Sequence, residues 1–185
     1  MTDARIVRSR AGLRAALLDL LQATAFDRIT IRDITARAGV GYNTYFRHYP
    51  GKEALLDDLA AAEIQALCDL TLPVYDRADP LAACVALCRF VEAHRALWTA
   101  LLNGGAEGRV KEEMLRHARE AMAARQRHSP LPGDLGPLLT ISAMVELLAW
   151  WLRQEAPYDA EEIGAIMNRV IVAPAEERQT PGRRD

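Results

Sequence analysis

The stretch that decides the fold lies near the N-terminus, where residues 29–55 read ITIRDITARAGVGYNTYFRHYPGKEAL. Thr30 precedes Asp33 by three residues, a variant of the capping box, and this spacing predicts that a helix begins here. Gly39 can adopt the left-handed conformation that ends a helix, and Pro50-Gly51 breaks the next one. The pattern therefore predicts two short helices joined by a tight turn.

Together with the preceding segment, these two helices have the spacing of a helix-turn-helix. Leucines at helical spacing predict a first helix from about Ser9 to Ala25. The glycine turn lets the second helix hold the third, from about Gly41 to Tyr49, against the first. The third helix then presents its N-terminal residues to a groove of DNA. Asn43 can both donate to and accept from a base edge, and Tyr42 adds a ring with a hydroxyl.

The remainder of the chain is also helical by its pattern, so the fold class is all-α with about nine helices in total. No alternation typical of strands is present. We also expect a Pro/Gly loop over 129–137 and a polar tail that begins at Pro174. The predicted helices after the third cover 52–70 (ending before Pro73), 80–94, 95–102, 107–127, 137–155 and 159–172.

Composition excludes several classes of protein. Half of the 185 residues are hydrophobic, and 23 Lys+Arg nearly balance 25 Asp+Glu, which is neither a disordered composition nor that of a strongly basic coat protein. The balance hides a split, because residues 1–52 hold nine basic and four acidic residues and have a net charge of +5, whereas the remainder has −7. A basic N-terminal part beside an acidic remainder favours DNA binding at one end only.

Other features of the chain give expectations by absence. Cys68, Cys84 and Cys88 form no C-x-x-C pair, so we expect no disulfide framework, no metal and no cofactor. The N-terminus has no apolar run of a secretion signal, and the apolar run 138–152 is interrupted and too short to cross a bilayer. These observations predict a cytoplasmic protein with no membrane partner.

The run 29–55 closely resembles the signature of the tetracycline-repressor (TetR) family. That signature reads Thr-Val-Arg-Asp-Ile-Ala, then Ala-Gly-Val, then Thr-x-Tyr-x-His-Phe-Pro-x-Lys-Glu-x-Leu, and the resemblance covers about residues 9–60. It implies a homodimeric transcriptional regulator, a repressor that binds double-stranded palindromic operator DNA and is released by a small molecule. The implied domains are a helix-turn-helix domain over 1–52, a ligand-binding and dimerisation domain over 53–173, and a flexible tail over 174–185.

Residue by residue, the resemblance implies phosphate contacts from Thr30, Thr44, His48 and Lys52, and base contacts from Tyr42 and Asn43. Arg47 lies on the same predicted helix and joins this DNA-binding set. Phe46 stands where the family usually has a tyrosine that contacts phosphate. Tyr45 either replaces that contact or packs in the core with Tyr49.

The larger C-terminal part contains no G-x-S-x-G, H-E-x-x-H, phosphate-loop or dinucleotide motif, so we do not expect an enzyme. In the family, this part binds the ligand and forms the dimer. Soft, aromatic and titratable side chains suggest a pocket for a small apolar or aromatic inducer. Its candidate lining residues are Cys84, Cys88, Trp98, Met114, His117 and Trp151. The last two helices are expected to supply half of a four-helix dimer interface, with candidate residues Leu148, Ile163, Ile166, Met167 and Val170.

Two alternatives remain open at this stage. One is a helical enzyme or protein-interaction bundle that does not bind DNA. The other is a DNA-binding regulator that senses oxidants through Cys84 and Cys88, which lie four residues apart on one predicted helix.

Overall fold

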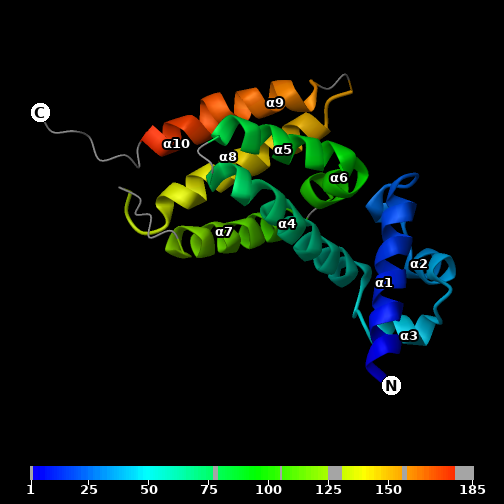
Figure 1. Cartoon of the computed structure of the whole chain (residues 1–185). Helices are drawn as coiled ribbons and strands as arrows, with labels where there is room; N and C mark the ends of the chain where they lie inside the picture. Colours follow the sequence, from blue (N-terminus) through cyan, green and yellow to red (C-terminus); the bar gives the residue numbers. More distant parts are fainter. Residues whose placement is uncertain (1, 77–78, 105, 125–130, 156–157, 178–185) are drawn as a thin grey trace, which may run out of the picture.

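The computed structural model describes residues 2–76, 79–104, 106–124, 131–155 and 158–177, and within them it is all-α, as predicted. A small N-terminal head lies at one end of the molecule, and the long helix α4 crosses from it into a larger helical body (Figure 1). The head consists of α1 (Thr2–Leu21), a 3-10 turn (Phe26–Arg28), α2 (Ile31–Ala38) and α3 (Tyr42–Phe46). The body consists of most of α4 (Lys52–Asp76) with α5 (Pro80–Ala93), α6 (Arg95–Asn103), α7 (Glu107–Ala124), α8 (Leu135–Leu152), α9 (Ala160–Met167), a π-helical turn (Asn168–Val172) and α10 (Ala173–Glu177).

Local chemistry begins and ends several helices as the sequence predicts. The Thr30 hydroxyl accepts from the amide of Asp33, and the Asp33 carboxylate accepts from the amide of Thr30. Gly39 ends α2 with a φ of 62°, in the region that costs glycine least. Asp79 caps α5, with Pro80 at its first position. The α9 box is formed by Asp159 and Glu162.

Several helix ends differ from the prediction: α1 ends at Leu21 rather than near Ala25, and α8 covers Leu135–Leu152 rather than 137–155. The first helix begins at Thr2 rather than near Ser9, and α3 ends at Phe46. The helix expected to stop before Pro73 instead runs through it to Asp76. Proline removes one main-chain bond to the residue four positions earlier. Here that residue is Asp69, which is exposed, so the lost bond lies at the surface and the packing of α4 outweighs it.

The last helix also continues where the sequence predicts a tail. α9, the π turn and α10 follow one another without a break, so helix extends through Pro174 to Glu177. The amide of Ala173 donates to the carbonyl of Asn168, a five-residue step that widens the helix directly before Pro174. The wider turn relieves the clash between the proline ring and the preceding turn. Counted as one, this run brings the α-helices of the described residues to nine.

Helix α8 is apolar nearly all round. Among the described residues it is the one helix long and apolar enough to cross a membrane by length and composition, a test that the core helix of a globular protein also passes. Its side chains Ile141, Val145 and Leu148 are buried in the core of the body, whereas Leu139 and Trp150 are exposed. The apolar content of α8 thus serves two different faces.

Helices α5 and α9 approach each other closely at Gly164 of α9. A β-carbon added there would lie 2.8 Å from the Cα of Val85 in α5. This separation is shorter than carbon atoms tolerate, so the backbones of α5 and α9 pack against each other only because residue 164 has no side chain.

We expect Gly164→Ala to lower the free energy of unfolding by about 1–3 kcal/mol, because the new methyl group must push two packed helices apart. Urea denaturation followed by circular dichroism measures this. Gly108→Ala in α7 is the matched control, since a β-carbon there meets no atom within 4 Å. That control should be neutral or slightly stabilising. Equal effects of the two substitutions would contradict the close approach.

Candidate nucleic-acid interface

The third helix of the head exposes the side chains that the sequence predicts for DNA contact. Tyr42 is 49% exposed, and Asn43 and Arg47 are exposed, while Thr44 and His48 are half-buried. A shallow hollow is lined by residues of α2, the turn and the start of α3: Arg32, Thr35, Ala36, Gly39, Val40 and Tyr42. Arg32 had no place in the predicted set, although a basic residue in the first turn of α2 was a visible signal.

Two tyrosines fix α3 from behind. Tyr45 is fully buried and donates its hydroxyl to the carbonyl of Gly51 at 3.1 Å. Tyr49 is also buried. Both therefore pack in the core, and Tyr45 does not replace the hydroxyl missing at Phe46. The Phe46 ring is 45% exposed and stacks edge-on against Tyr42, with 5.2 Å between ring centroids.

Asp58 of α4 ties the elements of the head to α4. Its carboxylate accepts two hydrogen bonds from Arg14 of α1, at 2.7 and 2.6 Å, and one from Arg10 at 3.0 Å. Tyr49, just after α3, donates its hydroxyl to the same carboxylate. Partial burial raises the pKa of Asp58, but the bonds from Arg14 and Tyr49 and the charges of both arginines outweigh it, so that the pKa falls to about 2. No sequence motif marks this residue.

Lys52, predicted as a phosphate contact, is held within the head. Its ammonium donates to the carbonyls of Phe26, Asp27 and Ile29 at 2.9–3.0 Å and lies 4.6 Å from the centre of the Phe26 ring. These bonds close the 3-10 turn against the start of α4. Thr30 is exposed, but its hydroxyl is engaged in the capping box of α2. Both residues therefore stabilise the first turn of a helix. The free main-chain amides of such a turn favour the binding of anions such as phosphate.

The body contains a cavity of about 220 Å³ between α4, α5, α7, α8 and the end of the last helix. Of the six predicted lining residues, only Cys84 lies on it. Cys88, Trp98 and Trp151 are completely buried in the core instead. The residues that the sequence did not single out include Thr71, Leu72, Thr140, Ile141 and Met144.

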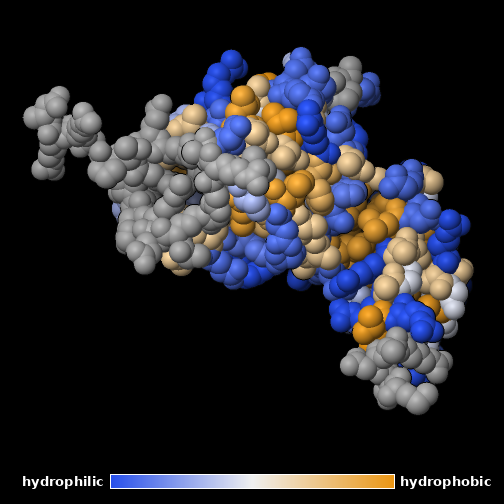
Figure 2. All heavy atoms as spheres, in the orientation of Figure 1, coloured by the Kyte–Doolittle hydropathy of each residue, from blue (hydrophilic) through white to orange (hydrophobic). Residues whose placement is uncertain are grey.

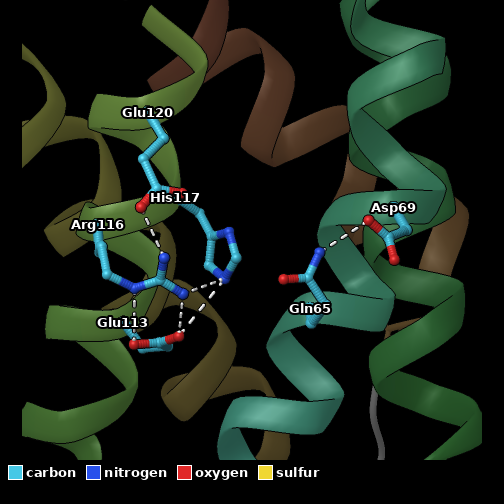
Figure 3. Close-up of polar contacts among 6 residues, drawn as sticks. All are labelled: Gln65, Asp69, Glu113, Arg116, His117 and Glu120. Carbon is cyan, nitrogen blue, oxygen red and sulfur yellow. Dashed lines mark hydrogen bonds and ion pairs between the residues drawn. The ribbon is translucent and has the colours of Figure 1, made fainter. Parts of the chain in front are cut away.

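Met114 and His117 are likewise buried away from the cavity lining. The His117 ring points from α7 toward Gln65 of α4 (Figure 3) and lies 2.9 Å from the Arg116 guanidinium and 3.5 Å from Glu113. Arg116 also binds Glu113 and Glu120. His117 is thus part of a polar layer between two helices.

Three of the predicted dimer residues are buried within the chain itself. Leu148, Ile163 and Met167 have no exposed surface, so they cannot contact a second copy. The apolar stripe read from the last helix is its inner face, which packs on α5 and α8. Ile166 is half-buried and Val170 is 62% exposed, so only these two of the set lie toward solvent.

Comparisons with known proteins agree with this geometry. Residues 13–59 match the profile of bacterial regulatory proteins, tetR family. Over 58 residues the chain is 40% identical to an uncharacterized HTH-type transcriptional regulator, YxbF of Bacillus subtilis; the match covers 31% of this chain and 15% of that protein.

Solved structures resemble the chain over most of its length. A TetR transcriptional regulator from Streptococcus agalactiae superposes with a TM-score of 0.66 at 22% identity, over 92% of this chain and 97% of that one. RolR in complex with resorcinol gives 0.64 at 19% identity, over 99% and 98%. At these identities the likeness concerns the fold.

The head is a helix-turn-helix DNA-binding domain. It consists of a capped α2, a glycine turn and an α3 whose buried face is held by tyrosines and whose exposed face carries polar side chains. Residues 13–59 thus match the DNA-binding part of the bacterial regulatory proteins of the tetR family, and the chain as a whole has the fold of a solved TetR regulator.

We expect Asp58→Asn to destabilise the protein at neutral pH by roughly 1–3 kcal/mol, because it removes the charge that accepts four hydrogen bonds from Arg10, Arg14 and Tyr49. A carboxyl group whose pKa is lowered on folding adds stability above its unfolded pKa, near 4, and loses it as the pH falls toward 2. The difference between the two proteins should therefore shrink below pH 4. Urea denaturation at a series of pH values measures it, and a difference independent of pH would contradict the assignment.

Proposed function

We propose that the protein is a homodimeric transcriptional regulator, a repressor that binds palindromic operator DNA and leaves it when a small molecule enters the body. The observation that carries this proposal is the arrangement of α3. Tyr42, Asn43 and Arg47 face solvent, while Tyr45 and Tyr49 hold the helix from behind. A polar face on a fixed helix is what reading of base edges in the major groove requires.

The contacts divide by chemistry. Asn43 and Tyr42 read bases, since an amide and a phenol can discriminate donors from acceptors. Arg47, His48, Thr44 and the starts of α2 and α4, at Thr30 and Lys52, position the phosphate backbone. The net charge of +5 over residues 1–52 favours this end of the molecule for DNA.

The dimer is formed by the outer faces of α8 and the last helix. Leu139 is 51%, Trp150 40% and Val170 62% exposed. The Trp150 ring lies 6.0 Å from that of Tyr158, which is 47% exposed. Together with Ile166, these side chains form an apolar surface on two neighbouring helices, of the kind that a symmetric dimer buries. The proposed interface thus uses the exposed face of the last helix, with Ile166 and Val170, and not the buried face with Ile163 and Met167.

Release of DNA runs through α4. This helix lines the cavity with Thr71 and Leu72 near one end and binds the head through Asp58 near the other. A ligand that shifts the cavity end changes the separation of the two heads, and both must fit one operator. RolR, which shares the fold, has been solved with resorcinol, and this supports a small organic ligand.

This function places the protein in the cytoplasm, without an enzymatic activity. The alternative of an oxidant sensor has little support, because burial raises the pKa of the Cys88 thiol to about 12, and the thiolate is the reactive form. A helical bundle that does not bind DNA would show no salt-dependent retention of its own upstream DNA in a gel-shift experiment.

Operator binding should separate three substitutions. Arg47→Ala should weaken all sites alike and lower the slope of log K against log salt by about one, whereas Asn43→Ala should cost about 1–3 kcal/mol at its own base pair and relax sequence preference. Lys52→Ala should chiefly lower the free energy of unfolding, because its ammonium is bonded within the head. Binding to operator variants at several salt concentrations, with urea denaturation beside it, measures all three. If Lys52→Ala leaves stability unchanged and lowers the salt slope, Lys52 is a phosphate ligand; if none of the three alters DNA binding, the proposed function is wrong.

Val170→Asp should convert the dimer to a monomer, because a carboxylate would be buried without a partner at the interface. Sedimentation velocity measures the molecular mass. Leu70→Asp is the matched control, since Leu70 is 47% exposed on α4, away from the proposed face, and should leave the mass unchanged. A Val170→Asp protein with the mass of the parent would exclude this surface as the interface.

A further inference from the structure

The cavity in the body has a chemical character that restricts its ligand. We propose that it binds a small, uncharged molecule with one or two rings that donates a hydrogen bond, such as a phenol or an aryl alcohol, and that it excludes the corresponding anions. The proposal rests on the proposed function only for the consequence of binding. The ligand class follows from the lining itself.

The volume sets the size of the ligand. The cavity measures about 220 Å³, and an apolar cavity of roughly 150 Å³ is enough to hold benzene. One or two fused rings therefore fit, whereas drug-sized ligands occupy pockets of about 300–1,000 Å³. Met122 and Met144 lie among the lining residues, and their flexible thioethers pack well against aromatic rings.

Charge excludes anions. Every lining residue of the cavity among the described residues is uncharged. An ionised carboxylate in such a site gives up part of its hydration and meets no cation among the described lining residues, at a cost of up to several kcal/mol. Neutral molecules do not meet this cost, so the cavity discriminates by charge before any specific contact is made.

Hydrogen bonding then selects a donor. Thr71 and Thr140 supply the lining hydroxyls, one from α4 and one from α8. The Thr71 hydroxyl donates to the carbonyl of Leu67 at 2.8 Å, and the Thr140 hydroxyl donates to that of Gly136 at 3.0 Å. Each hydroxyl has one proton and two lone pairs. Since both protons are already used within their helices, each hydroxyl offers a ligand its lone pairs, which accept a hydrogen bond.

Three probes of similar size and shape test this chemistry. 1-Naphthol donates a hydrogen bond, 1-methoxynaphthalene only accepts one, and 1-naphthoate is an anion. We expect 1-naphthol to bind the full-length protein about 5- to 10-fold more tightly than 1-methoxynaphthalene, the effect of one hydrogen bond, and 1-naphthoate at pH 7 to bind at least 100-fold more weakly than 1-naphthol. Isothermal titration calorimetry measures the three dissociation constants.

Variants connect the preference to the two threonines. The double variant Thr71→Val, Thr140→Val keeps the shape of both side chains and removes both hydroxyls, so the preference for 1-naphthol over 1-methoxynaphthalene should fall to less than 2-fold. Ser142→Ala is the matched control, because Ser142 makes the same kind of bond to the carbonyl of Leu138 on α8 but does not line the cavity. It should keep the full preference. Ala118→Leu, which fills the cavity, should abolish binding of all probes.

Several outcomes overturn the proposal: no binding of 1-naphthol to the folded protein, equal binding of 1-naphthoate, no preference for the donor, or a preference that survives in the double variant. Thermal unfolding of each variant confirms that it is folded. A gel shift with operator DNA in the presence of 1-naphthol is a separate readout. If 1-naphthol binds with the expected preferences but DNA stays bound, the ligand class stands and the proposed mechanism of release is wrong.

Discussion

The structure depends on the carboxylate of Asp58. It lies in the second turn of α4 and gathers Arg10 and Arg14 from α1 and Tyr49 from the end of the helix-turn-helix. Its side chain is only 18% exposed, so each of these bonds is partly shielded from water and worth more than a surface ion pair. Through this one group, the recognition helix, the supporting helix α1 and the start of α4 are fixed relative to one another.

This constraint gives α4 two roles at once. Leu55, Leu56 and Leu59 in its first turns are buried with the leucines of α1, so the start of α4 belongs physically to the head. Thr71 and Leu72, about 20 Å further along at 1.5 Å per residue, line the cavity of the body. Under the proposed mechanism, a helix fixed at one end in this way passes on a displacement of its other end as a rotation of the whole head. On the face shown in Figure 2, apolar surface gathers where the head adjoins the body, and this junction is the place where such a rotation changes contacts.

The features that the sequence predicts well are local. The capping boxes at Thr30 and Asp159 and the left-handed Gly39 depend on residues within four positions of one another, and the helix-turn-helix follows from them. The sequence predicts that helices stop at Pro73 and Pro174, and both predictions are wrong because the cost of a proline is local, whereas the packing that overcomes it is not. Periodicity identifies an apolar stripe but not which neighbour it faces. For this reason Leu148 and Ile163 were predicted at a dimer interface and Trp98 and Trp151 at a pocket, although all four are enclosed in the core.

The small size of the cavity also bears on how a ligand acts under the proposed mechanism. To move a two-state equilibrium from 1:99 to 99:1, a ligand must favour one state by about 5.5 kcal/mol. A molecule of 10 or 12 non-hydrogen atoms binds with at most about 1.5 kcal/mol per atom and ordinarily far less, so most of its binding energy has to differ between the two states. A ligand that binds a rigid cavity of the same shape in both states would stabilise both equally and would not shift the equilibrium. The threonines can make the binding energy differ between the two states. Thr71 lies on α4, which carries the head, whereas Thr140 lies on α8, which belongs to the body. Under the proposed mechanism, a ligand that donates to one threonine while its ring packs on the other helix binds best at one separation of α4 from α8, and the position of the head is thereby coupled to its presence.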